Sequence, residues 1–193
     1  MNPVNAETER QPFYIQDNFC ETADSLRTEF EEKLAAMGES EAGLTPLAYV
    51  FFANKYRFLA ANGDQIFTQA IMDDLINRLC TWATETLGAF HVSTPQVRLY
   101  ISGCNRDLVR DALNARWHYL LFLSHDDAQF ATVRIMKENR DASDQFGLGS
   151  LLKSKPLFNR LLVHDISDAY GIEFTGKSMD PLQGMLILDG YLW

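Results

Sequence analysis

The chain has 193 residues, enough for one compact domain with a substantial core and too few for two ordinary ones. A hydrophobic content of 47%, including 12% aromatic residues, is typical of a globular protein, and no apolar run approaches the roughly 20 residues that cross a bilayer. The net charge of −9 repels phosphate backbones and anionic lipids, so we expect neither a nucleic acid nor a membrane as a partner.

Residues 1–11 are polar, and we expect a disordered tail there, followed by a single domain over residues 12–193. The start lacks the basic and then apolar pattern of a secretory signal, which favours a cytoplasmic location. Cys20, Cys80 and Cys104 are widely spaced and form no C-x-x-C pair, so we expect free thiols rather than disulfides or a zinc site.

The first half of the domain has the periodicity of helices. A short strand is predicted at residues 12–16, with Asp17 or Asn18 as the N-cap of an amphipathic helix that runs to about Met37 and is stopped by Gly38.

The segment 47–60 is aromatic-rich, and its periodicity does not distinguish helix from strand. After a turn at residues 62–64, apolar residues recur at helical intervals from Ile66 to Leu87, before Gly88. This second helix should cover a sheet.

After Pro95 the sequence changes to short apolar segments divided by turn residues. Helices followed by strands predict an α+β domain in which N-terminal helices buttress a largely antiparallel sandwich or barrel. We expect the basic cluster around Lys153 to be a solvated loop. Strands are predicted near residues 96–102, 116–124, 129–136, 158–164, 169–174 and 184–192.

Four motifs carry a family resemblance: the opening PFYIQDNF, a Y-x-x-G strand at Tyr100, the strand NRLLVHD, and the closing GMLILDGYLW. With this layout the chain resembles the Fe(II)- and 2-oxoglutarate-dependent oxygenases, and most closely the prolyl-hydroxylase-like ones. The resemblance implies a double-stranded β-helix, of the jelly-roll or cupin-like type, buttressed by N-terminal helices.

The same resemblance implies four site residues: an H-x-D pair, a second His, and a basic residue that binds oxoglutarate. Two imidazoles and a carboxylate on one face of the iron leave positions open for oxoglutarate and oxygen. Matched from Tyr100, the H-x-D pair falls on Val109 and Asp111, so only the carboxylate remains as a possible metal ligand. The second His falls near Asp168, and the basic residue near Gly184.

A competing register uses the literal H-x-D of His125 and Asp127, with His164 as the second imidazole and Lys177 as the carboxylate binder. These are the right residue types for a facial triad. The simpler interpretation is a polar turn at His125 and an apolar strand around His164.

Asp111 and Asp168 come from two strand positions that would hold opposing metal ligands, so they are candidates for one catalytic pair. Two nearby carboxylates shift each other's pKa values and act as acid and base, within about 10 Å of each other, or hold a hard cation. His118 is the third candidate; it either hydrogen-bonds within the sheet or points into the barrel beside Asp111. His91 is expected on the surface.

These residues support three hypotheses. The leading one is an oxygenase-like protein whose altered, metal-free centre binds a small molecule or peptide or carries out different chemistry. The second is an active non-haem iron hydroxylase with Fe(II) and 2-oxoglutarate as cofactors. The third is a structural or regulatory interaction protein.

Overall fold

A computed structural model describes residues 12–38, 48–52, 56–88, 91–100, 115–124, 133–138, 148–166, 170–173 and 181–193. The helices are α1 (Ala23–Gly38), α2 (Gly63–Ile66) and α3 (Gln69–Leu87), with a 3₁₀ turn at Pro181–Gln183. The strands are β1 (Phe13–Gln16), β2 (Ala48–Phe52), β3 (Tyr56–Asn62), β4 (Gln96–Tyr100), β5 (Trp117–Phe122), β6 (Val133–Glu138), β7 (Leu148–Ser154), β8 (Arg160–Asp165), β9 (Tyr170–Glu173) and β10 (Met185–Leu192).

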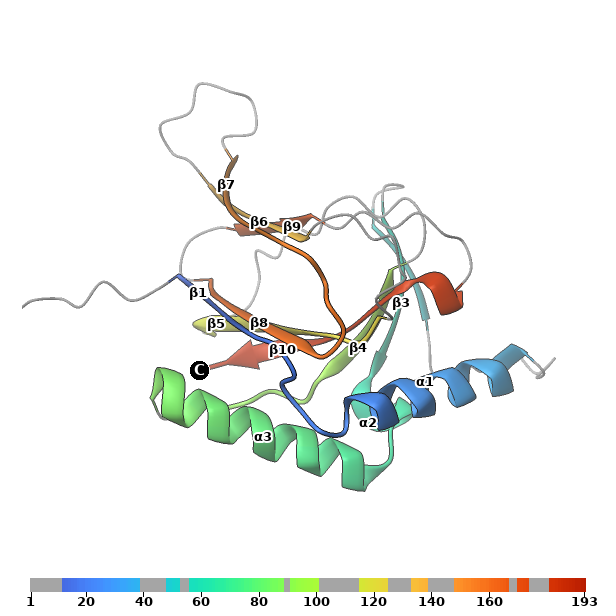
Figure 1. The fold of residues 1–193 in the computed structure, drawn as a ribbon. Helices are drawn as coiled ribbons and strands as arrows, with labels where there is room; N and C mark the ends of the chain where they lie inside the picture. Colours follow the sequence, from blue (N-terminus) through green and yellow to red (C-terminus); the bar gives the residue numbers. More distant parts are fainter. Residues whose placement is uncertain are drawn as a thin grey trace, which may run out of the picture.

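Ten strands form two sheets within the described residues. The larger sheet has the order β1-β8-β5-β10-β4-β3-β2, and the smaller one the order β7-β6-β9. Every neighbouring pair is antiparallel. The smaller sheet lies over one face of the larger sheet, and α1 and α3 lie along the other face (Figure 1). The predicted helices and largely antiparallel sheets are therefore confirmed.

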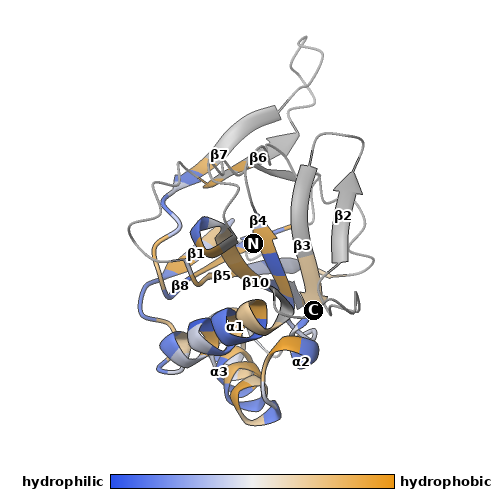
Figure 2. Ribbon diagram, turned by 90° about the vertical axis from the view of Figure 1, so that its right-hand side faces the viewer, coloured by the Kyte–Doolittle hydropathy of each residue, from blue (hydrophilic) through white to orange (hydrophobic). Residues whose placement is uncertain are grey.

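One hydrophobic core lies between the large sheet and the helices. Successive side chains of a strand point to opposite faces, and alternate residues of β5, such as Tyr119 and Leu121, point toward the helices. They belong to the same cluster as Leu26 of α1 and Leu75 and Leu79 of α3, and all of these side chains are buried. Hydrophilic and hydrophobic bands alternate along α1 and α3 (Figure 2), as expected for helices with one face on a core.

A second core lies on the opposite, inner face of the large sheet. Leu120 and Phe122 of β5 pack there with Leu162 of β8 and Ile187 of β10, and Ile135 of β6 reaches the same cluster from the smaller sheet. Phe122 is paired with Arg160 at the end of β5, so this apolar cluster occupies the end of the sheet where β5 stops and β8 begins.

The second predicted helix is interrupted once. α2 ends at Ile66, and α3 begins only at Gln69. The backbone N–H of Asn62 donates to Oε1 of Gln65 at 3.2 Å, so the first turn is capped by its own third residue. The predicted 62–64 turn is thus the start of α2.

Two other details differ from the sequence predictions, the cap of α1 and the segment around Lys153. Neither Asp17 nor Asn18 caps α1, which begins at Ala23; Asp17 instead binds the guanidinium of Arg160, with Nη2 to Oδ2 at 2.8 Å. The helix begins too far along the chain from Asp17 and Asn18 for either side chain to reach the N–H groups of its first turn.

The segment 47–60 contains two strands, β2 and β3, paired as a hairpin. The predicted loop around Lys153 is wrong, because Lys153 and Ser154 end strand β7 and pair with β6. A bulge in this pairing between Ile135 and Met136 disturbs the regular alternation.

Cys20 and Cys80 are free thiols, as predicted, while Cys104 lies outside the described residues. Among the helices in the described ranges, none is long and apolar enough to cross a membrane.

Candidate functional site

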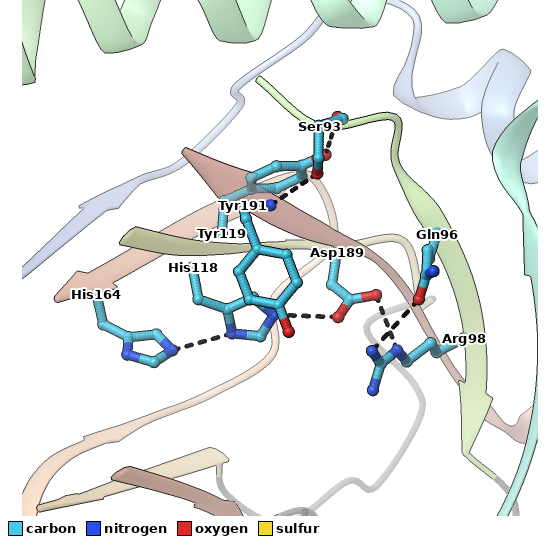
Figure 3. A network of polar contacts seen from close by, with 8 residues as sticks. All are labelled: Ser93, Gln96, Arg98, His118, Tyr119, His164, Asp189 and Tyr191. Atoms are coloured by element: carbon cyan, nitrogen blue, oxygen red, sulfur yellow. Dashed lines mark hydrogen bonds and ion pairs between the residues drawn. The ribbon is translucent and has the colours of Figure 1, made fainter. Parts of the chain in front are cut away.

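A connected group of polar side chains crosses the inner face of the large sheet. Nδ1 of His118 (β5) lies 3.1 Å from Nε2 of His164 (β8), and Nε2 of His118 lies 3.0 Å from Oδ2 of Asp189 (β10). The other carboxylate oxygen of Asp189 forms an ion pair with Nε of Arg98 (β4) at 2.9 Å. Figure 3 shows these side chains in one row across four adjacent strands. We call His164, His118, Asp189 and Arg98 the histidine network.

The network is almost completely removed from solvent. His164, His118 and Asp189 are exposed by only 0%, 1% and 2%, and the Arg98 side chain by 15%. Burying a polar group costs free energy unless the group is hydrogen-bonded, and burying a charge costs free energy unless the charge is paired. The charge on Asp189 is balanced by Arg98, although the Nε–H of Arg98 is not aligned with Oδ1 as in a hydrogen bond. Gln96 accepts from Nη2 of Arg98 at 3.4 Å.

An aromatic ring fixes the imidazole at the centre of the network. Tyr191 stacks on His118 with ring centroids 5.0 Å apart and planes at 28°. The two imidazoles, by contrast, are nearly perpendicular, with planes at 85° and centroids 5.2 Å apart. His118 is thereby held by a carboxylate, a second imidazole and a stacked ring.

The residue between Asp189 and Tyr191 has little room for a side chain. A Cβ on Gly190 would meet the hydroxyl of Tyr119 and would lie 2.5 Å from Oγ of Ser93. Tyr119 points to the helix-facing side and donates to the carbonyl of Ser93 at 3.3 Å. Burial holds the pKa of Tyr119 well above its ordinary value of 10.0, so the hydroxyl keeps its hydrogen.

Burial also determines the protonation of His164. Its pKa lies well below the ordinary value of 6.5, because desolvation and then the neighbouring His118 disfavour the imidazolium, while a hydrogen bond with the backbone of Asp165 opposes them. The ionised carboxylate of Asp189 can only accept, so Nε2 of His118 must carry a hydrogen. Nδ1 of His118 and Nε2 of His164 share one further hydrogen between them.

Comparisons with known proteins place this fold. No described protein family matches the sequence, and no curated protein matches it. Solved structures do match: a prolyl-4-hydroxylase from Pseudomonas putida is 17% identical with a TM-score of 0.56, covering 94% of this chain and 91% of that one. A prolyl hydroxylase from Trichoplax adhaerens, in complex with a hypoxia inducible factor oxygen degradation domain peptide fragment, is also 17% identical, with a TM-score of 0.54 and coverages of 93% and 83%.

The non-haem α-ketoglutarate-dependent epimerase SnoN from nogalamycin biosynthesis is 7% identical, with a TM-score of 0.61 over 95% of this chain and 78% of that one. The fold resembles that of the 2-oxoglutarate/Fe(II) oxygenases. Identities this low show the fold of an oxygenase and leave its chemistry to be argued from the residues.

Within this oxygenase-like fold, two of the sequence-predicted site residues are brought together. His118 and His164 are directly opposite on β5 and β8, and His118 does hydrogen-bond within the sheet while pointing to its inner face. Asp111, Asp168, His125 and Asp127 lie outside the described residues, so the carboxylate pair and the competing triad stay predictions. His91 is exposed, as predicted.

Sequence reasoning missed Asp189 and Arg98. One signal was available: Asp189 interrupts the otherwise apolar strand MLILDGYL, and an acid inside such a strand needs a buried partner. The partner is not predictable without knowing that β10 lies between β5 and β4.

The network lies at one end of the inner face. Trp117, the first residue of β5, pairs with Asp165, the last of β8, and the next pair inward is His118 with His164. Phe122, at the apolar end, follows His118 by four positions along β5, about 13 Å at 3.3 Å per residue. The inner face thus has a polar end and an apolar end.

On the register matched from Tyr100, two of the positions that the oxygenase resemblance assigns to iron and oxoglutarate carry side chains that cannot bind these groups. A Val side chain at position 109 has no atom that ligates iron, and neither Gln183 nor Gly184 carries the charge that binds a carboxylate. Gln183 is exposed and Gly184 is buried at the start of β10. Among the described residues no group of three or more His, Cys, Asp or Glu side chains is arranged to hold a metal ion.

Proposed function

We propose that this chain is an oxygenase-like protein with an altered centre, in which a double-stranded β-helix binds a small molecule or peptide without oxoglutarate-dependent hydroxylation. The observation that carries the proposal is the histidine network, which stands on the inner face of the large sheet where a purely structural sandwich would bury apolar side chains. The replaced residue at Val109 supports the loss of the family's iron chemistry.

The predicted carboxylates are part of this proposal. Asp168 belongs to the connection that leaves β8 at Asp165. Asp111 belongs to the connection that enters β5 at Trp117. The first connection leaves β8 and the second enters β5 at the polar end of the inner face, and we propose that the two carboxylates act there as an acid and base pair with His118.

The similar structures suggest only a broad class of ligand for this chain. One similar structure holds a peptide fragment and another is an epimerase of nogalamycin biosynthesis. For this chain we propose a cytoplasmic protein that takes either a small molecule or an extended peptide between the two sheets.

Oxoglutarate turnover is the deciding experiment. The purified protein is incubated with Fe(II) and 2-oxoglutarate, and succinate is measured beside the Pseudomonas putida prolyl-4-hydroxylase as a positive control. We expect no succinate above a sample without protein, because the register matched from Tyr100 keeps only Asp111 of the residues assigned to iron and oxoglutarate. Succinate formation that depends on added Fe(II) would overturn the proposal and favour an active hydroxylase.

A further inference from the structure

Arg98 is the most exposed member of the histidine network. Its side chain is 15% exposed, whereas the side chains of His118 and Asp189 are exposed by only 2% and 3%. We propose that the Nη edge of the Arg98 guanidinium binds the carboxylate of a ligand on the inner face of the large sheet. The inference rests on the proposed function for the place of the ligand, between the two sheets, and it adds the chemical class of that ligand.

Asp189 holds Arg98 at the inner edge of its guanidinium. Oδ1 of Asp189 lies 2.9 Å from Nε of Arg98, and Oδ2 lies 3.0 Å from Nε2 of His118, so the carboxylate shares its charge between two partners. A guanidinium carries its N–H donors in a rigid planar fork, and fixing Nε therefore fixes the direction of the Nη groups. Arg98 is oriented before a ligand arrives, which lowers the entropy cost of binding.

The Nη edge makes a contact that a ligand can replace. Nη2 of Arg98 donates to Oε1 of Gln96 at 3.4 Å, and Gln96 is exposed (Figure 3). This distance is long for a hydrogen bond to an amide oxygen. A carboxylate oxygen forms a shorter and stronger bond with the same donor, at about 2.7–2.9 Å. Exchange of the Gln96 amide for the carboxylate of a ligand therefore strengthens the contact with Arg98.

The cross-strand neighbours of Arg98 leave room beside its guanidinium. They are Ala60 on β3 and Ile187 on β10. Ala60 is half-buried, and its single methyl group is too short to cover a guanidinium, while Ile187 is buried and forms an apolar base. The half-buried Tyr191 adds a phenol hydroxyl, a hydrogen-bond donor, on the same inner face (Figure 3). These side chains suit a ligand with a charged end and an apolar body.

The charge of the site favours a carboxylate over a phosphate. Arg98 supplies one positive charge, which it already shares with Asp189, and Gln96 and Tyr191 supply neutral groups. A carboxylate carries one negative charge and matches the planar fork of a guanidinium, whereas a phosphate brings further charge that this site does not balance. The carboxylate belongs either to a small organic acid or to a peptide, and both offer the same group to Arg98.

An NMR titration of the full chain, without iron or oxoglutarate, tests the site. The probes are benzoate, N-acetyl-trialanine with a free carboxylate, its C-terminal amide, and inorganic phosphate. Arg98→Lys keeps the charge opposite Asp189 and loses the fork, and Arg116→Lys is the matched control, because Arg116 is an exposed arginine outside the network. We expect a saturable shift of the Arg98 Nε–H signal with one or both carboxylates. Arg98→Lys should weaken binding about 10–100-fold, as one lost hydrogen bond to a charged group does, and the control should not.

Three results overturn the inference: no saturable binding of either carboxylate, equal binding of the peptide amide, or tighter binding of phosphate. Undiminished binding by Arg98→Lys overturns it as well. If that variant fails to fold, the wild-type spectra decide, because a saturable shift at the Arg98 Nε–H supports the site and shifts confined to other residues refute it. Succinate formation refutes the proposed function whether or not a carboxylate binds at Arg98, and absent carboxylate binding without succinate refutes this inference alone.

Discussion

The two faces of the large sheet are built from the same strands and hold different kinds of core. On the helix-facing side, alternate residues of β5 are Trp117, Tyr119 and Leu121, which join one continuous hydrophobic cluster with α1 and α3. On the inner side, β5 presents His118 beside an apolar group that begins at Leu120.

The first face depends on shape and volume. The second face depends, at one end, on completing every polar contact. A buried polar network with one partner missing is less stable than an apolar core. An apolar core loses stability in steps that follow the volume removed. Substitutions on the two faces should therefore destabilise the fold for different reasons: loss of a polar partner on the inner face, and loss of packed volume on the helix-facing side.

The largest effect is expected from Asp189→Ala. Removing this carboxylate leaves Arg98 and Nε2 of His118 buried without it, and breaking a buried ion pair from one side costs about 3–5 kcal/mol of unfolding free energy. Urea denaturation measures the loss. Asp189→Asn is the matched control and should lose less, because its side-chain oxygen still accepts from His118. Equal stability of Asp189→Ala and wild type would show that the polar end does not stabilise the fold.

On the helix-facing side, Leu121→Ala should cost about 2–5 kcal/mol, since the side chain is fully buried and its removal leaves a cavity. Leu121→Met conserves the volume and should cost less than about 1.5 kcal/mol. Urea denaturation of both variants provides the comparison. A large loss in Leu121→Met would mean that this face is as geometrically demanding as the network.

Gly190→Ala should cost about 1–3 kcal/mol, as overpacking of a filled site does. The added methyl group meets the hydroxyl of Tyr119 on the helix-facing side, directly behind the network. Thermal unfolding of Gly190→Ala, Tyr119→Phe and the double variant separates the effect of each substitution from their interaction. The double variant should recover part of the loss; strict additivity would contradict a direct clash between the two side chains.

The smallest effect is a pH slope. The pKa of His164 is depressed in the folded chain, so the unfolded chain binds more protons and the unfolding free energy falls as the pH drops below 6.5. His164→Gln should remove this part of the slope, whereas His91→Gln should keep it. The measurement is urea denaturation between neutral and mildly acidic pH. An unchanged slope in His164→Gln would assign the acid sensitivity to other groups.

Much of the fold could be predicted from the sequence, because a helix or strand with one buried face has apolar residues at regular intervals. The apolar positions of α3 follow from this, and the nearly continuous apolar run of β10 fits a strand that is buried on both faces. The hairpin of β2 and β3 was not distinguished from a helix, since a short apolar run fits either structure. Strand β7, LGSLLKS, was missed because its glycine, serines and lysine resemble a loop, and its pairing with β6 stabilises it.

The candidate site was predicted less well, for a physical reason. A polar network across four strands depends on strand order and register, which sequence periodicity does not contain. His118 and His164 were considered separately, 46 positions apart, while the structure places them in one cross-strand pair. Asp189 and Arg98 complete the network from β10 and β4.

Gly190 also affects the register in which β10 pairs with its neighbouring strands. A shift of this strand by one residue would bring Asp189 or Tyr191 to the helix-facing side, where even a Cβ would meet the side chains of Tyr119 and Ser93. The same shift would withdraw the carboxylate from His118. The glycine thus helps to fix the register of β10, because a shifted register is disfavoured by steric clash as well as by the lost contact with His118. Insertions within Met185–Leu192 should therefore be tolerated poorly.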